Sequence, residues 1–157
     1  MKTTALLIDA NMLLLLVIGR VAREFVGQHK RLEQFGPEDV DLLQELVAES
    51  QRVTTTPNVW TEVSNLVRFR NERLLHPDLF WVMRDQIKAI EEKYMPSISI
   101  IDDYAFRDLG LTDTGLLLQL DGDMTLLTID APLYEHALSR GQRAINFHHL
   151  REERGLV

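Results

Sequence analysis

Four acidic residues occupy positions in which an ionised carboxylate is costly to desolvate. Asp9 directly follows the apolar segment ALLI, and Asp130 directly follows the apolar segment LLTI. Glu62 falls within the apolar arc of a helical pattern, and Asp113 lies in the first turn of another predicted helix. Buried charges of this kind persist when they are paired or bind a cation.

The chemistry that such a set favours is binding of a hard divalent cation. Two like charges 4 Å apart repel by about 4 kcal/mol at an effective dielectric of 20. Mg²⁺ and Mn²⁺ neutralise such a cluster through oxygen ligands. One or two such ions suit hydrolysis of a phosphodiester bond. We therefore interpret Asp9, Glu62, Asp113 and Asp130 as candidate metal ligands and catalytic residues.

Each acid has a structural alternative when it is taken alone. Asp9 and Asp130 can each cap the helix that follows. Asp113 can be stabilised by a helix dipole, by roughly 0.3–1 kcal/mol. Glu62 can reach solvent at the start of its helix or pair with Arg68 or Arg70.

Strands and helices are predicted to alternate along the chain. Strands are expected over residues 5–8, 52–56, 97–101, 124–129 and 144–147. Helices are expected over residues 11–28, 36–50, 58–73, 77–94, 103–109, 112–120 and 131–140. This alternation predicts an α/β sandwich around a mostly parallel sheet, in one domain covering residues 1–157. In such sheets the ligand crevice lies beyond the carboxyl ends of the strands, where Asp9 and Asp130 are expected to meet.

Composition narrows the class of protein. The chain has 157 residues, of which 45% are apolar and 26% charged, as in ordinary globular domains. It contains no cysteine, which excludes disulfides and thiolate metal sites. The apolar run after Asp9 is shorter than the roughly 20 residues of a membrane span, so we expect a cytoplasmic protein without membrane contact. The net charge of −7 argues mildly against a dedicated nucleic-acid binder.

The segments LLIDANMLLLLVIG, TTTPNVWTEVSNLV, LGLTDTGLLLQL and LLTIDAPLYEHALSRGQRAINF resemble, in order and spacing, the four acidic motifs of the PIN-domain ribonuclease family. The resemblance extends from Lys2 to about Phe147. It implies a three-layer α/β/α fold with a parallel sheet of four or five strands. It also implies that the four acids bind Mg²⁺ or Mn²⁺, supported by Asn11 and Thr128.

Small members of this family are often VapC-like toxins that cleave RNA, form homodimers and are paired with a protein antitoxin. The present chain differs from the compact toxins in its longer segment between Asp9 and Glu62. For RNA contact the first candidates are Arg68, Arg70 and Arg73.

Secondary candidates for RNA contact are Arg140 and Arg143, because arginine binds phosphate through forked donors. The C-terminal segment with His148 and His149 is interpreted as a surface or dimer-contact tail. If the two histidines lie in a strand, they point to opposite sides and do not share a metal.

Other function classes fit less well. Phosphoryl-transfer domains with an aspartate after the first strand need a lysine late in the chain, and no lysine follows Lys93. The glycines fit no phosphate-binding loop. The remaining alternative is a PIN-like module that binds RNA or protein without cleavage, and the presence of all four acids argues against it.

Overall fold

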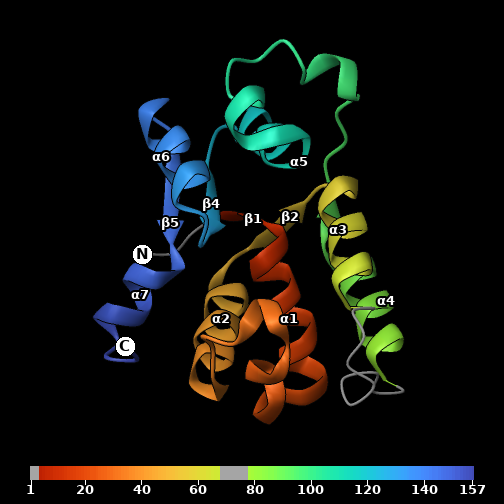
Figure 1. Cartoon of the computed structure of the whole chain (residues 1–157), viewed down its shortest axis with the longest axis vertical. Coiled ribbons are helices and arrows are strands. Elements are labelled where there is room, and N and C mark those ends of the chain that lie inside the picture. The colour runs from red at the N-terminus through yellow and green to blue at the C-terminus, as the bar shows by residue number, and fades with distance from the viewer. Residues whose placement is uncertain (1–3, 68–77) are drawn as a thin grey trace.

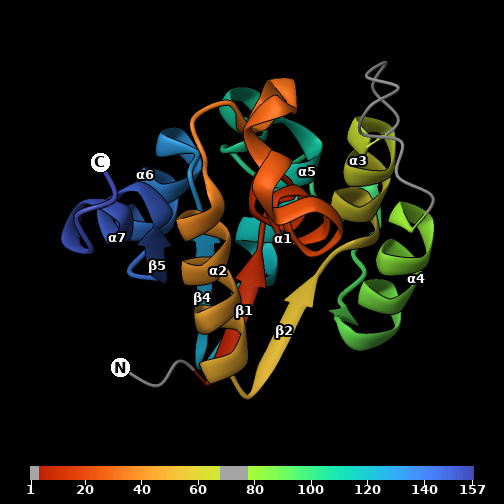
Figure 2. The same cartoon turned by 90° about the horizontal axis from the view of Figure 1, so that it is seen from below.

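The computed structural model of the protein describes residues 4–67 and 78–157, in which five strands form one parallel sheet. The order across the sheet is β3-β2-β1-β4-β5, and every neighbouring pair is parallel. The strands are β1 (Ala5–Ile8), β2 (Arg52–Thr55), β3 (Glu91–Glu92), β4 (Met124–Thr128) and β5 (Arg143–Asn146). All strands therefore end at the same edge of the sheet, as the arrowheads in Figure 2 show.

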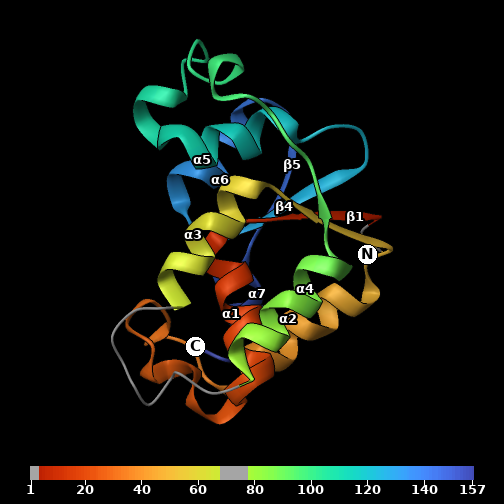
Figure 3. The same ribbon diagram turned by 90° about the vertical axis from the view of Figure 1, so that its right-hand side faces the viewer.

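Helices cover both faces of this sheet, which gives three layers (Figures 1 and 3). One layer contains α1 (Ala10–Ala22), α2 (Pro37–Glu49), α3 (Pro57–Val67) and α4 (Leu79–Ala89). The other contains α5 (Phe106–Gln119) and α6 (Ala131–Ser139). The last helix, α7 (Phe147–Glu153), follows β5 and contacts the start of α2. The expected three-layer α/β/α sandwich is confirmed.

The centre of the core is formed by β1 and α1. All four residues of β1 are fully buried, because helices cover both faces of the sheet. Helix α1 is also buried around most of its circumference, from Met12 to Gly19. A helix that is apolar all round is stable only when neighbours surround it, and α2, α3 and α4 all contact α1. This arrangement fixes the start of α1, and hence Asp9, rigidly in the core.

Several element boundaries differ from the sequence-based expectation. The helix expected over residues 11–28 ends at Ala22 and continues as a 3-10 helix, η1 (Arg23–Gln28). The helix expected over residues 77–94 is shorter in the structure, where α4 ends at Ala89 and the strand β3 follows. The strand expected over residues 97–101 is wrong, because Ser97–Ser99 forms a 3-10 helix, η4, in which Ile98 is 71% exposed.

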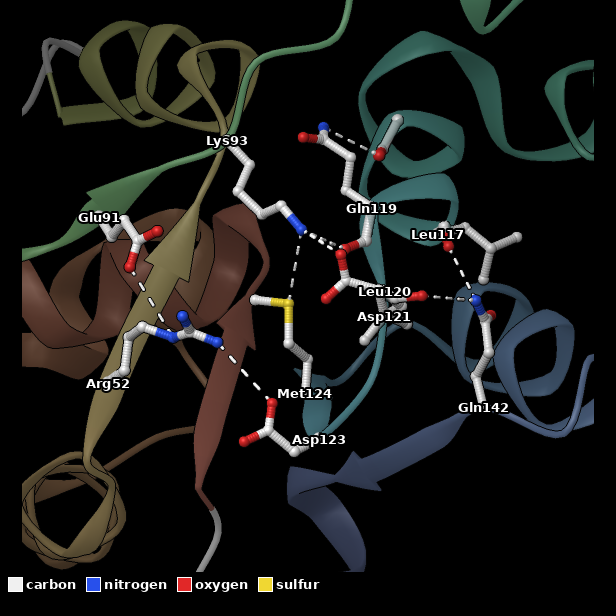
Figure 4. A network of polar contacts seen from close by, with 11 residues as sticks. Arg52, Glu91, Lys93, Leu117, Gln119, Leu120, Asp121, Asp123, Met124 and Gln142 are labelled. Atoms are coloured by element: carbon white, nitrogen blue, oxygen red, sulfur yellow. Dashed lines mark hydrogen bonds and ion pairs between the residues drawn. The ribbon is translucent and has the colours of Figure 1, made fainter.

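Largely exposed ion pairs lie at the edge of the sheet at which the strands begin (Figure 4). Lys93 Nζ lies 2.6 Å from Asp121 Oδ2. The guanidinium of Arg52 lies 3.8 Å from carboxylate oxygens of both Glu91 and Asp123. Exposed pairs of this kind contribute little stability, roughly 0–1 kcal/mol each. They do, however, place each of the two cations beside a carboxylate.

No helix among the described residues is long and apolar enough to cross a membrane.

Helices α1 and α2 approach closely at Gly19, which gives a first prediction. A Cβ atom placed on Gly19 would lie 2.6 Å from Cγ1 of the buried Val40. We expect Gly19→Ala to lower the free energy of unfolding by about 1–3 kcal/mol because the helices must separate. Urea denaturation measures this loss.

The partner of the clash supplies the control. Val40→Ala removes the methyl groups that a Cβ at position 19 would meet. The double variant should therefore be more stable than the sum of the two single losses predicts, by at least about 0.5 kcal/mol. Strictly additive losses would contradict the proposed contact.

Candidate active site

The strand order places Asp9 and Asp130 at neighbouring positions. The order reverses between β1 and β4, since β2 and β3 extend to one side and β5 to the other. A reversal of this kind opens a crevice at the carboxyl ends of the strands, where ligands bind in open α/β sheets. Asp9 follows β1 directly, and Asp130 follows β4 by two residues. The convergence of these two aspartates, expected from the sequence, is confirmed.

Asp9 is almost completely buried and is held by two hydrogen bonds. Its Oδ1 accepts from the backbone N–H of Met12 at 2.9 Å, so Asp9 is the N-cap of α1. Its Oδ2 accepts from the hydroxyl of Thr128 on the neighbouring strand. The same hydroxyl oxygen accepts from the backbone N–H of Asp130 at 2.9 Å. Thr128 thus connects the two aspartates, in keeping with its predicted supporting position.

Asp130 is the N-cap of α6. Its Oδ1 accepts from the backbone N–H of Leu133 at 2.8 Å. Asp9 and Asp130 therefore both have the structural role that the alternative interpretation assigned to them. An N-cap uses only part of a carboxylate's acceptor capacity, because an ionised carboxylate has about four lone-pair sites. The capping role is therefore compatible with a ligand role.

Asp113 and Glu62 complete the group from opposite layers of the fold. Glu62 is half-buried on α3, and Asp113 is half-buried on α5. Gly110 has a φ of 79° and divides α5 into two segments, so that the helix carrying Asp113 starts in a new direction. A residue with a side chain is strained at this φ, which explains the glycine.

Burial, together with repulsion within the group, raises the pKa of two of its members. Burial raises the pKa of Asp113 from 3.8 to about 7, and the charges of Asp9, Asp130 and Glu62 contribute to that rise. Burial also raises the pKa of Asp9 to about 6, against the hydrogen bonds from Thr128 and Met12, with added repulsion from Asp130 and Glu62. The main causes of the two shifts include no lysine or arginine of the described residues. The four carboxylates therefore lie in one region of negative electrostatic potential.

The donor set suits a hard divalent cation, because it consists of carboxylate oxygens around a buried anchor. Within the described part of the chain, however, no three His, Asp or Glu side chains stand close enough together to hold one ion. Like charges repel one another, which favours separation of these side chains. An ion would have to draw them together.

Two supporting residues were not identified from the sequence. The hydroxyl of Thr55, at the end of β2, donates to the carbonyl of Ile8 at 3.0 Å and so fixes the backbone directly before Asp9. The hydroxyl of Thr56 accepts from the backbone N–H of Val59 at 3.2 Å and starts the helix that carries Glu62. The run of threonines before Pro57 was the available signal.

The remaining predicted residues lie in different places. Asn11 is half-buried in the first turn of α1, beside Asp9 in sequence. The candidate RNA-binding residues Arg68, Arg70 and Arg73, which include the possible partners of Glu62, lie outside the described residues.

The secondary arginines and the tail are not at the acidic group. Arg143 begins β5 and so lies at the opposite edge of the sheet. Arg140 forms a two-pronged ion pair with Asp103, at 2.5 and 3.0 Å. His148 and His149 belong to the helix α7, so the strand geometry considered for them does not apply.

Comparison of the chain with protein-family models, with curated proteins and with solved structures gives no match.

Proposed function

We propose that this chain is a ribonuclease that depends on Mg²⁺ or Mn²⁺. The observation that carries the proposal is that four carboxylates, though too far apart to hold one ion as they stand, repel one another near the reversal point of a parallel sheet. Such a group destabilises the fold unless it binds a cation, so a functional reason for keeping it is expected.

Asp9, Glu62, Asp113 and Asp130 would hold the ion. When bound, a divalent cation neutralises the phosphate and activates water for hydrolysis. Asp9 is oriented for this role by Met12 and Thr128, and its burial excludes bulk water from one side of the site. Asp130 keeps one oxygen beyond its capping bond. Glu62 and Asp113 approach from the two helical layers and would complete the ligand set.

The resemblance to PIN-domain ribonucleases supports RNA as the substrate. It also supports a cytoplasmic protein that forms a homodimer and pairs with an antitoxin, as VapC-like toxins do. These are parts of the same proposal, and the order and spacing of the four acidic motifs are their basis.

The test is cleavage of a mixed RNA pool by the purified protein with Mg²⁺, with Mn²⁺ or with EDTA. We expect cleavage with either metal and none with EDTA. We expect Glu62→Gln to lower the rate at least about 100-fold, since losing even an outer partner of a metal site costs roughly 10–100-fold. Glu135→Gln on the exposed surface of α6 is the control and should retain the wild-type rate.

The outcomes separate the proposal from its alternative. Cleavage that persists in EDTA, or in Glu62→Gln at the rate of the control, would contradict a metal-dependent site at these residues. RNA binding without cleavage under any metal condition would favour the non-catalytic PIN-like module instead.

A further inference from the structure

The segment between α1 and α2 carries a basic turn on a fixed backbone. Two 3-10 helices, η1 and η2 (Lys30–Leu32), form this segment. Val26 and Leu32 are buried in the core and hold it in place. Lys30 and Arg31, in contrast, are exposed. The turn therefore presents two cations from a backbone that the core fixes.

His29 connects this turn to the helix that carries Glu62. Its Nε2 donates to the carbonyl of Leu66 at 3.1 Å, and its Nδ1 accepts from the backbone N–H of Arg31 at 3.1 Å. These two bonds require the neutral ring with the proton on Nε2. His29 is 4% exposed, so it acts as a positioning residue for Lys30 and Arg31.

A small pocket lies beside the basic turn. It has a volume of about 180 Å³ and is lined by His29, Lys30, Arg31 and Leu66. Leu66 lies one helical turn beyond Glu62, about 6 Å along the axis of α3. Helices α1 and α3 run side by side away from the sheet, so the segment after α1 comes to lie beside the far end of α3 (Figures 1 and 3). The pocket thus lies one helical turn of α3 beyond Glu62.

The charges of Lys30 and Arg31 are not neutralised within the described residues. Other cations of the described residues form ion pairs, among them Arg23 with Asp41, Lys93 with Asp121 and Arg140 with Asp103. The chain as a whole is acidic, with a net charge of −7. A polyanion that approaches the four carboxylates therefore needs local cations, and the Lys30–Arg31 turn supplies two at the adjacent pocket.

We propose that Lys30, Arg31 and the adjoining pocket form a subsite for one nucleotide of single-stranded RNA. Lys30 and Arg31 bind phosphate, and the pocket, smaller than the roughly 300–1,000 Å³ of sites for whole drug-sized ligands, takes a base or a sugar. As a subsite of the cleavage reaction it rests on the proposed nuclease function. As an RNA-binding site it does not.

The first experiment measures RNA binding without cleavage. In the Asp9→Asn background, the Lys30→Gln/Arg31→Gln variant is titrated against a fluorescein-labelled single-stranded RNA at roughly 50–200 mM salt. We expect its Kd to rise about tenfold or more at the lower salt. The slope of log affinity against log salt should become shallower by about 0.7 for each phosphate that the variant no longer neutralises.

The matched control removes two positive charges elsewhere. Arg52→Gln/Lys93→Gln alters the ion pairs where the strands begin, at the opposite ends of the strands from the acidic group. It should change Kd less than about twofold. Equal RNA affinities of the two double variants would overturn the subsite.

A second experiment separates the subsite from the nuclease. With Asp9 retained, Lys30→Gln/Arg31→Gln should raise KM for RNA cleavage and leave kcat unchanged. A lower kcat with the same KM would contradict a binding role. Absence of cleavage by the wild-type protein would contradict the nuclease alone, because the binding measurement does not depend on it.

Discussion

Replacing Asp9 with asparagine should make the metal-free protein more stable at pH 8, even though it removes the best-anchored residue of the site. Burial and the neighbouring acids raise the pKa of Asp9 from 3.8 to about 6. The folded state therefore binds the Asp9 proton more tightly than the unfolded state does. The stability due to this proton is complete below about pH 4 and is lost as the pH rises through 6.

The expected size follows from that shift. The rise of the Asp9 pKa from 3.8 to about 6 corresponds to roughly 3 kcal/mol of penalty for the charged form at pH 8. Asparagine removes the charge and keeps the cap, because its Oδ1 can still accept from Met12. The amide nitrogen that replaces Oδ2 cannot accept from the Thr128 hydroxyl, and the loss of this bond offsets about 1 kcal/mol. We expect a net gain of about 2 kcal/mol, or a Tm higher by roughly 4–8 °C for a domain of this size.

Thermal unfolding in EDTA at pH 5 and pH 8 measures this effect. At pH 5 the gain should be clearly smaller, because only about half of the penalty remains there, and it should vanish near pH 4, where the unfolded state is also protonated. Asp85→Asn, at an exposed position on α4, makes the same chemical change and should shift Tm little at either pH. A gain that is equal at the two pH values would exclude relief of charge as its cause.

Added Mg²⁺ should reverse the order of stability. A ligand that binds only the folded state raises Tm, and the wild type should bind the ion more tightly than Asp9→Asn does. The wild type should therefore gain more from the ion. Cleavage should be lost in the variant at the same time. An equal gain in Tm for the two proteins would remove Asp9 from the metal site.

The sequence predicted the centre of this fold better than its periphery. The strands β1, β2, β4 and β5 were found because each is a short apolar or β-branched run beside a helix signal. Strand β3 was missed because it has two exposed glutamates and no apolar pattern. It exists because Thr54 of β2 is in register with Glu91. The serine–isoleucine alternation after Pro96 imitates a strand but has no neighbour to pair with among the described residues.

In the candidate site, too, some features were predictable from the sequence and others were not. The meeting of Asp9 and Asp130 was predictable because parallel strands end at a common edge. The bond between Thr128 and Asp9 joins residues 119 positions apart, yet strand alternation already placed Thr128 on the correct face. The contact of His29 with Leu66 was not predictable, because it depends on how the segment after α1 folds back. Local pattern thus identified the acids, and only the tertiary structure identified the basic turn.

The buried ion pair between α2 and α7 was also invisible in the sequence, and its loss should have the largest effect on stability. Arg151 Nε donates to Asp39 Oδ1 at 2.7 Å, and the two side chains are only 5% and 6% exposed. Arg151 also donates to the carbonyl of Gln34 and lies over the ring of Phe35. The C-terminal segment, expected to be a surface tail, is therefore fixed to the core.

The same arginine, Arg151, also contacts His148 and affects its pKa. Burial, followed by the charge of Arg151, lowers the pKa of His148, which keeps its ring neutral. Its Nδ1 lies 3.2 Å from Nη1 of Arg151 and can accept from it. Arg151 thus contacts α2, the segment before it and its own helix, so truncating Arg151 leaves several polar groups without a partner.

We expect Arg151→Met to lower the free energy of unfolding by about 3 kcal/mol. Removing one partner of a buried pair typically costs 3–5 kcal/mol, because the other charge stays buried. The value should fall at the lower end, since Asp39 retains its bond from the Gly36 N–H at 2.8 Å at the start of α2. This loss corresponds to a decrease in Tm of roughly 6–12 °C.

The same two helices offer a matched control. Arg154 reaches Glu45 of α2 at 3.2 Å, but that pair is about half exposed. Arg154→Met should therefore cost no more than about 1 kcal/mol. Adding Asp39→Asn to Arg151→Met removes the unpaired charge and should restore much of the loss, because removing a whole buried pair is often close to neutral. Equal melting temperatures of Arg151→Met and Arg154→Met would show that the buried pair of Arg151 with Asp39 contributes no more stability than the exposed pair of Arg154 with Glu45. Apolar contacts alone would then hold the C-terminal helix.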